Sequence, residues 1–323
     1  MMITKRQLFA LTAAVFCLLL SFRPIPDISD LNDTGRYVLS VHNYCKSNIE
    51  ETFFAKDISY SIFHALTSPA TCLVKSDVLF LFEVASFLPL IFLLFAKWQN
   101  GTFLWACSLM FSVAGLELMT NAMRQNFAML VFFGAISLVQ RHQVTALLVL
   151  LIALAAHISV VAFLPFFIWL SWKNLSTKMM QGLLWSGISI LFMYYESILE
   201  FFNEWTGFFS AVYAENLTLL FTLFMTLPLY WFYGLRYLYV KENISSNEKK
   251  AIVYSTGVLF ICFIMFPSIT YRYAIFATAL QIFLLTRSES PKFLAGGYAL
   301  IGSLVHLAVM LAVSNHYEFL ING

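Results

Sequence analysis

Residues 144–172 read VTALLVLLIALAAHISVVAFLPFFIWLSW, and this uncharged stretch decides how the chain is arranged in a membrane. A membrane-spanning helix needs about 20 apolar residues, so the stretch is long for one helix. One helix would put Arg141 and Lys173 on opposite sides of the membrane, whereas a hairpin of two short helices puts both on one side. Basic residues concentrate in cytoplasmic loops, which favours the hairpin. We therefore predict a turn at residues 155–159, with His157 at its apex.

The composition of the whole chain supports a membrane location. The 323 residues are 60% hydrophobic and 17% aromatic, and only 11% are charged. Soluble domains carry about 25% charged residues, so this balance lies far outside the soluble range. No run of basic residues that would follow a nucleic-acid backbone is present. The composition therefore predicts an all-α, polytopic membrane helix bundle, with residues 1–323 as a single integral membrane domain and no nucleic-acid partner.

The other apolar runs extend this bundle to about 11 transmembrane helices. A polar stretch, residues 23–77, separates the first run from the second and is predicted to be a periplasmic loop. With the hairpin counted as two, the predicted spans are 8–22, 78–96, 103–120, 127–139, 144–172, 179–199, 216–235, 251–267, 273–286 and 293–313.

The distribution of basic residues predicts the orientation in a bacterial inner membrane. Lys5 and Arg6 precede the first apolar run without a following cleavage site, so we interpret this run as an uncleaved signal anchor. The positive-inside rule then places the N-terminus in the cytoplasm and the C-terminus in the periplasm. Cys45 and Cys72 share the periplasmic loop, where a disulfide can form, but spacing alone leaves open whether they pair. No cluster with metal-ligand spacing is visible, so neither a metal nor another cofactor is expected.

Two arginines break the charge rule in short external segments. Arg124 opens the span that begins near residue 127, and Arg272 precedes the span that begins at residue 273. A guanidinium near the N-terminus of a helix suits a phosphate or a diphosphate. An arginine that extends to lipid headgroups is the alternative reading for each. Their matching predicted depth favours a shared function.

Other polar residues on the periplasmic side are candidates for proton transfer and sugar binding. His157, at the apex of the predicted hairpin, can act as a general base near neutral pH, or can be a histidine satisfied by a backbone carbonyl. Asp33, with Arg36 and Tyr37, follows the first span, where a carboxylate can hold a sugar hydroxyl or act as a base. Solvated loop residues would have the same sequence.

Several short elements resemble those of the EpsG-like branch of the Wzy-type polysaccharide polymerases. The segment Met123-Arg124-Gln125-Asn126-Phe127-Ala128 is similar to an Arg-Gln-x-x-Ala element of that family. The segments 156–159 (AHIS), 271–273 (YRY) and 30–37 resemble a His-Ser element, a Tyr-x-Arg-Tyr element and an acidic, Tyr-containing segment. At the two x positions of this element the family usually has apolar residues, whereas this chain has Asn126 and Phe127. The resemblance therefore does not predict how the helix packs near Arg124.

The resemblance implies a function and an architecture. It implies a GT-C-like, metal-independent glycosyltransferase that joins undecaprenyl-diphosphate-linked oligosaccharide repeat units on the periplasmic side, for O-antigen or exopolysaccharide chains. Membrane lipid and a chain-length regulator protein are the other partners that it implies. We expect the diphosphate to be bound by two arginines, the acceptor proton to be taken by His157 or Asp33, and the sugar to be bound by further polar residues. The arginines are Arg124 and Arg272, and the substrate-binding residues are Gln125, Arg36, Tyr37, Tyr271 and Tyr273.

Three other classes of membrane protein remain as alternatives. A polysaccharide flippase or exporter is equally polytopic, although such transporters have internal repeats that this chain lacks. An O-antigen ligase would use similar outer arginines. A membrane O-acyltransferase would use a membrane histidine, but the first span here has none.

Overall fold

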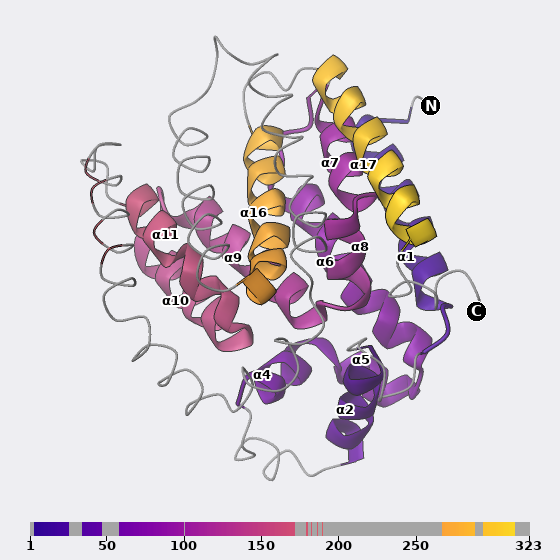
Figure 1. The fold of residues 1–323 in the computed structure, drawn as a ribbon. Helices are drawn as coiled ribbons and strands as arrows, with labels where there is room; N and C mark the ends of the chain where they lie inside the picture. The colour runs from indigo at the N-terminus through magenta and orange to yellow at the C-terminus, as the bar shows by residue number, and fades with distance from the viewer. Residues whose placement is uncertain are drawn as a thin grey trace.

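A computed structural model describes residues 3–25, 34–46, 58–99, 101–171, 267–287 and 293–313, together with positions 179, 182, 186 and 189. Every element in these segments is a helix (Figure 1). The elements are α1 (Lys5–Ser21), α2 (Thr34–Lys46), α4 (Ile58–Thr67), α5 (Pro69–Val74), α6 (Asp77–Phe95), α7 (Thr102–Met110), α8 (Val113–Thr120), α9 (Met123–Leu138), α10 (Gln143–Ala156), the 3-10 helix η1 (Ile158–Phe163), α11 (Leu164–Ser171), α16 (Pro267–Arg287) and α17 (Phe293–Val313).

Two described helices, α6 and α17, are long and apolar enough to cross a membrane, and α7 with α8 is apolar enough only as a bent pair, either a broken span or a re-entrant loop. The predicted span over 103–120 is therefore not one straight helix, because α7 and α8 meet at a bend of 63°. Ser112 caps α8 by accepting a hydrogen bond from the N–H of Gly115. A Cβ at Gly115 would overlap the carbonyl oxygen of Leu109, so this close bend requires glycine. The predicted spans 179–199, 216–235 and 251–267 lie largely outside the described residues, and the total of eleven stays a prediction.

Different segments close the two ends of the bundle. At one end, Arg6 donates to the carbonyl of Leu93 at 2.7 Å, and the N–H of Lys97 donates to the carbonyl of Thr286 at 3.1 Å. These contacts join the start of α1 to the ends of α6 and α16. At the opposite end lie α2, α4 and α5 (Figure 1). We call these three helices the cap, and the end that they cover the outer end.

The predicted hairpin is confirmed. Helix α10 ends at Ala156, His157 is extended (φ −158°, ψ 129°), and η1 and α11 then return. One pocket is lined by residues 139–145 together with Leu170 and Ser171, so α11 ends beside the start of α10. The 14 residues of α10 rise about 21 Å, and η1 with α11 covers about 24 Å.

Apolar side chains cover the outside of the bundle as well as its core. On α10, Val144, Leu147, Leu148 and Leu151 are all exposed. On α17 the exposed residues include Leu294, Ile301, Leu304, Val305 and Val309. Soluble proteins rarely expose continuous apolar stripes of this kind, whereas helices in contact with lipid do. The chain is therefore a helical membrane protein.

Candidate functional site

Three helices of the bundle meet at a cluster of phenylalanines. Phe276 of α16 stacks on Phe163 of η1 with ring centroids 4.2 Å apart, and it lies 5.4 Å from Phe132 of α9. Phe132 and Phe163 are 6.4 Å apart. All three rings are completely buried. Helices α9, η1 and α16 are therefore neighbours, and their outer ends lie on the same side of this cluster.

Residue spacing places Arg124 and His157 at the same depth. Arg124 precedes Phe132 by eight residues of α9, a rise of about 12 Å. His157 precedes Phe163 by the six residues of η1, which also rise about 12 Å. The α9–α10 hairpin gives the same result. Arg124 lies 14 residues before the end of α9, and His157 lies 14 residues after the start of α10, so both are equally far from the turn that joins the two helices.

The backbone of Arg272 lies at this depth too. Phe132 packs on Phe276, and Phe133 stacks on Phe283 with centroids 4.4 Å apart, so α9 and α16 run side by side in the same direction. These two contacts place Arg124 level with residues 268–274 of α16. Helix α16 begins at Pro267, six residues before the predicted span, so Arg272 lies in the second turn of the helix. The side chains of Tyr271, Arg272 and Tyr273 lie outside the described part.

Arg124 is held by the cap. It is half-buried in the first turn of α9, and its Nε donates to the hydroxyl of Tyr37 on α2 at 3.4 Å. Tyr37 is only 4% exposed and packs on Phe63 of α4. Tyr37 therefore orients Arg124, and its ring does not offer the open surface to a sugar that the sequence predicted. Gln125 is likewise buried, whereas Arg36 is exposed.

The hydrogen bonds of His157 fix how its ring can act. Its Nδ1 accepts the backbone N–H of Ser159 at 3.1 Å and lies 2.8 Å from the hydroxyl of the same residue. A backbone N–H is always a donor, so Nδ1 carries no proton in this arrangement. The proton of the neutral imidazole then lies on Nε2, which makes Nε2 a hydrogen-bond donor.

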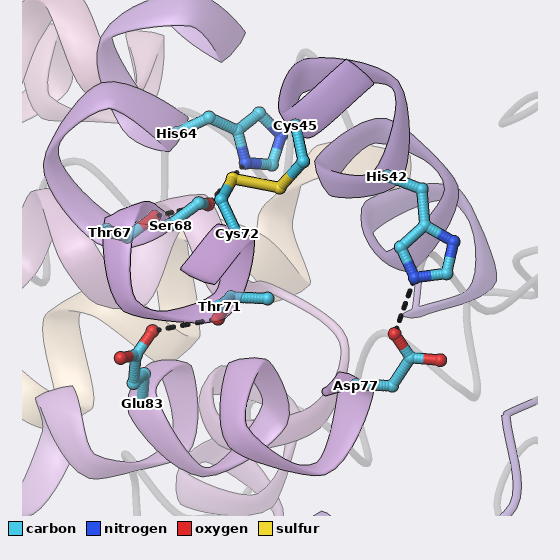
Figure 2. The surroundings of a disulfide bond; sticks show 9 residues. All are labelled: His42, Cys45, His64, Thr67, Ser68, Thr71, Cys72, Asp77 and Glu83. Carbon is cyan, nitrogen blue, oxygen red and sulfur yellow. Dashed lines mark hydrogen bonds and ion pairs between the residues drawn. A yellow bond between two sulfur atoms is a disulfide. The ribbon is translucent and has the colours of Figure 1, made fainter. Parts of the chain in front are cut away.

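A disulfide closes the cap next to a buried histidine. Cys45 of α2 is bonded to Cys72 of α5 (Figure 2). On α4, the Nε2 of His64 lies 2.5 Å from the hydroxyl of Ser40, and the Nδ1 of the same ring lies 3.0 Å from the hydroxyl of Ser68. The pairing that the sequence left open is therefore present, and it ties α2 and α5 together around His64.

His64 was not predicted from the sequence to be part of this region. Burial, and secondarily the positive charge of Arg124, lower the pKa of His64 to about 4. The ring lies near Arg124, because Tyr37, which contacts Arg124, packs on Phe63, the residue before His64. The four-residue spacing of His64 and Ser68 was the available signal, since it places both side chains on one helix face.

We expect the folded protein to lose stability as the pH falls from about 6.5 to about 4. In this range the unfolded chain protonates His64 and the folded protein does not, so acid favours unfolding. The cost reaches about 3 kcal/mol at the acid end of the range. Thermal unfolding in detergent from pH 7 to pH 4 measures it, and a His64→Gln variant should lose less stability over the same range. Equal losses in both proteins would contradict the buried, neutral histidine.

A second buried side chain fixes the junction just before Arg124. Arg23, which follows α1, is only 7% exposed. It donates to the carbonyl oxygens of Leu20 at 2.7 Å and of Thr120 at 3.0 Å. The hydroxyl of Thr34 also donates to the Thr120 carbonyl. Arg23 thus joins the ends of α1 and α8 to the start of the cap, a structural role that the sequence did not reveal.

Of the predicted site residues, the structure brings Arg124, His157 and the backbone of Arg272 to one level. Asp33 lies outside the described residues, directly before Thr34. Among the side chains that the structure describes, no group of three potential metal ligands occurs.

One comparison with known proteins gives a match. The model of the EpsG family matches residues 8–315, nearly the whole chain. Neither the curated proteins nor the solved structures give a significant match.

Proposed function

Since the chain belongs to the EpsG family, which indicates a polysaccharide-polymerase type of function, we propose that it joins undecaprenyl-diphosphate-linked oligosaccharide repeat units. The reaction takes place on the periplasmic side of the bacterial inner membrane. The growing glycan is transferred from its lipid diphosphate to a hydroxyl of another lipid-linked unit. The product is an O-antigen or exopolysaccharide chain.

The shared depth of Arg124, His157 and Arg272 carries this proposal. A lipid-linked diphosphate presents its charge at the membrane surface, so the residues that bind it must lie together near one end of the bundle. Ionisable residues within membrane-spanning segments are rare and usually functional. The disulfide in the cap supports a periplasmic location for the outer end, since disulfides form in oxidising compartments.

The proposed roles follow from the chemistry of the leaving group. The bond between the anomeric carbon and the diphosphate breaks, and negative charge grows on the departing oxygen. Arg124 and Arg272 stabilise that charge, as preorganised cations do in water-poor sites. His157, with its proton on Nε2, donates a hydrogen bond to a diphosphate oxygen, which replaces the role of base expected from the sequence. Asp33, the other base that the sequence predicted, stays the alternative proton acceptor, and its Asp33→Asn variant tests that role.

A gel of surface glycan from a deletion strain tests the function. Loss of a polymerase is expected to leave single repeat units on the lipid A core, with the ladder of longer chains absent. Loss of a ligase leaves no attached glycan, and loss of a flippase traps repeat units on the cytoplasmic leaflet. A normal ladder in the deletion strain would contradict the proposal, and so would either of the other two patterns.

A further inference from the structure

We propose that Glu83 is the carboxylate that accepts the proton of the attacking sugar hydroxyl. This inference rests on the proposed polymerase function and names the acceptor side of the same site. Glu83 belongs to α6, which is one of the two described helices long enough to cross a membrane. A carboxylate on a membrane-spanning helix is costly, so it calls for a specific role.

Contacts between α6 and α9 place Glu83 level with Arg124. The side-chain amide of Asn126 donates to the backbone carbonyl of Val84 at 3.0 Å, and the rings of Phe87 and Phe127 are 5.4 Å apart. Both contacts put the start of α9 beside the second and third turns of α6. These contacts also explain why Asn126 and Phe127 occupy these two positions, because each of the two side chains packs against α6. Glu83 therefore shares the depth of the predicted diphosphate site.

The face of α6 that carries Glu83 points toward the cap and α9. Phe80 and Phe87 precede and follow Glu83 by three and four residues, so the three share one face. The ring centroids of Phe80 and His64 are 6.2 Å apart. Phe87 packs on Phe127, three residues after Arg124. The carboxylate thus lies between the contact of Phe80 with His64 and the contact of Phe87 with Phe127, and both contacts are near Arg124.

The carboxylate is oriented and still accessible. Glu83 is half-buried, and the hydroxyl of Thr71 on α5 donates to its Oε2 at 3.2 Å (Figure 2). Within the part of the chain that the structure describes, Thr71 is its one side-chain partner, and no cation pairs with it. One oxygen is thus held in place by α5, and the other is available to a ligand.

The chemistry of the transfer requires such a group. The acceptor oxygen forms a bond to the anomeric carbon, while the bond from that carbon to the diphosphate breaks and undecaprenyl diphosphate leaves with the electron pair. The proton of the acceptor hydroxyl must go to a base. His157 is a donor through Nε2, whereas an ionised carboxylate accepts protons. Glu83 takes the proton and releases it to the periplasmic water.

Glycan ladders from a deletion strain that carries plasmid-borne variants test the inference. Glu83→Gln keeps the size of the side chain but removes the base, and we expect it to lower chain elongation by about 10²-fold or more. Thr71→Val removes the orienting hydroxyl with little change of shape, and we expect a several-fold loss. Asp77→Asn is the matched control, because this carboxylate is on the same helix and pairs with His42, apart from Glu83 and Thr71 (Figure 2). It should leave the ladder unchanged.

The outcomes separate the inference from the proposed function. If the wild-type plasmid fails to restore a ladder, the polymerase function itself is wrong. If it restores one, and Glu83→Gln and Thr71→Val restore the same ladder, only the role of Glu83 is overturned. Loss of the ladder in Asp33→Asn with a normal ladder in Glu83→Gln assigns the base to Asp33 and also overturns the inference. Protein amount and the Cys45–Cys72 disulfide, measured on non-reducing gels, show that each variant has folded.

Discussion

Replacement of Arg124 by alanine is expected to reduce glycan chain elongation by about 10²- to 10³-fold, the usual effect of removing one group that stabilises a developing negative charge. The guanidinium is half-buried in the first turn of α9, and Tyr37 holds its Nε. A guanidinium oriented in this way presents a planar fork that matches the geometry of phosphate oxygens. The length distribution of surface glycan in a complemented deletion strain measures the effect.

Two further variants separate charge from folding. Arg124→Lys keeps the charge but loses the planar fork, so we expect intermediate elongation. Arg141→Ala removes an exposed arginine at the other end of α9, beyond its C-terminus, and should have no effect. A full ladder from Arg124→Ala, at normal protein amount, would remove Arg124 from the site.

Loss of the Cys45–Cys72 disulfide is the second large effect that we expect. The bond closes a loop with a sequence separation of 27 residues. In the chain-entropy account, such a crosslink stabilises the protein by about 3.5 kcal/mol. Without it, α2 and α5 are no longer joined, and the contact of Tyr37 with Arg124 weakens. We therefore expect Cys45→Ser to lower both the unfolding temperature and chain elongation.

Thermal unfolding of the purified protein, with and without a reductant, measures the stability change. The reductant should lower the unfolding temperature of the wild-type protein and leave that of Cys45→Ser unchanged. Cys107→Ala is the matched control, because Cys107 is a free, buried cysteine outside the cap. The account of the cap is wrong if Cys45→Ser unfolds at the wild-type temperature and elongates glycan normally.

The features that the sequence predicted correctly depend on local patterns. The hairpin at His157 follows from the positions of Arg141 and Lys173, because the cost of moving charge across a membrane constrains topology. The depth of Arg124 and Arg272 follows from where the apolar runs begin. The bend between α7 and α8 was missed, because Ser112 and Gly115 form it within a run that is apolar on both sides.

The features that the sequence could not predict depend on contacts between distant segments. Arg23 looked like a loop residue, but its carbonyl partner at Thr120 is 97 positions away. Tyr37 looked like a sugar-binding tyrosine, but its contact is with Arg124, 87 positions away. The pairing of Cys45 with Cys72 depends on how α2 and α5 fold together, and sequence spacing does not determine that.

The most direct test is a reaction with purified components. Wild-type protein in lipid nanodiscs, supplied with undecaprenyl-diphosphate-linked repeat units, is expected to form chains of two or more units and to release undecaprenyl diphosphate in equal amount to the bonds formed. The Arg124→Ala protein should do neither, and Arg141→Ala should do both. Absence of longer chains with the wild-type protein, or equal rates with Arg124→Ala, would contradict a polymerase whose diphosphate site is built around Arg124.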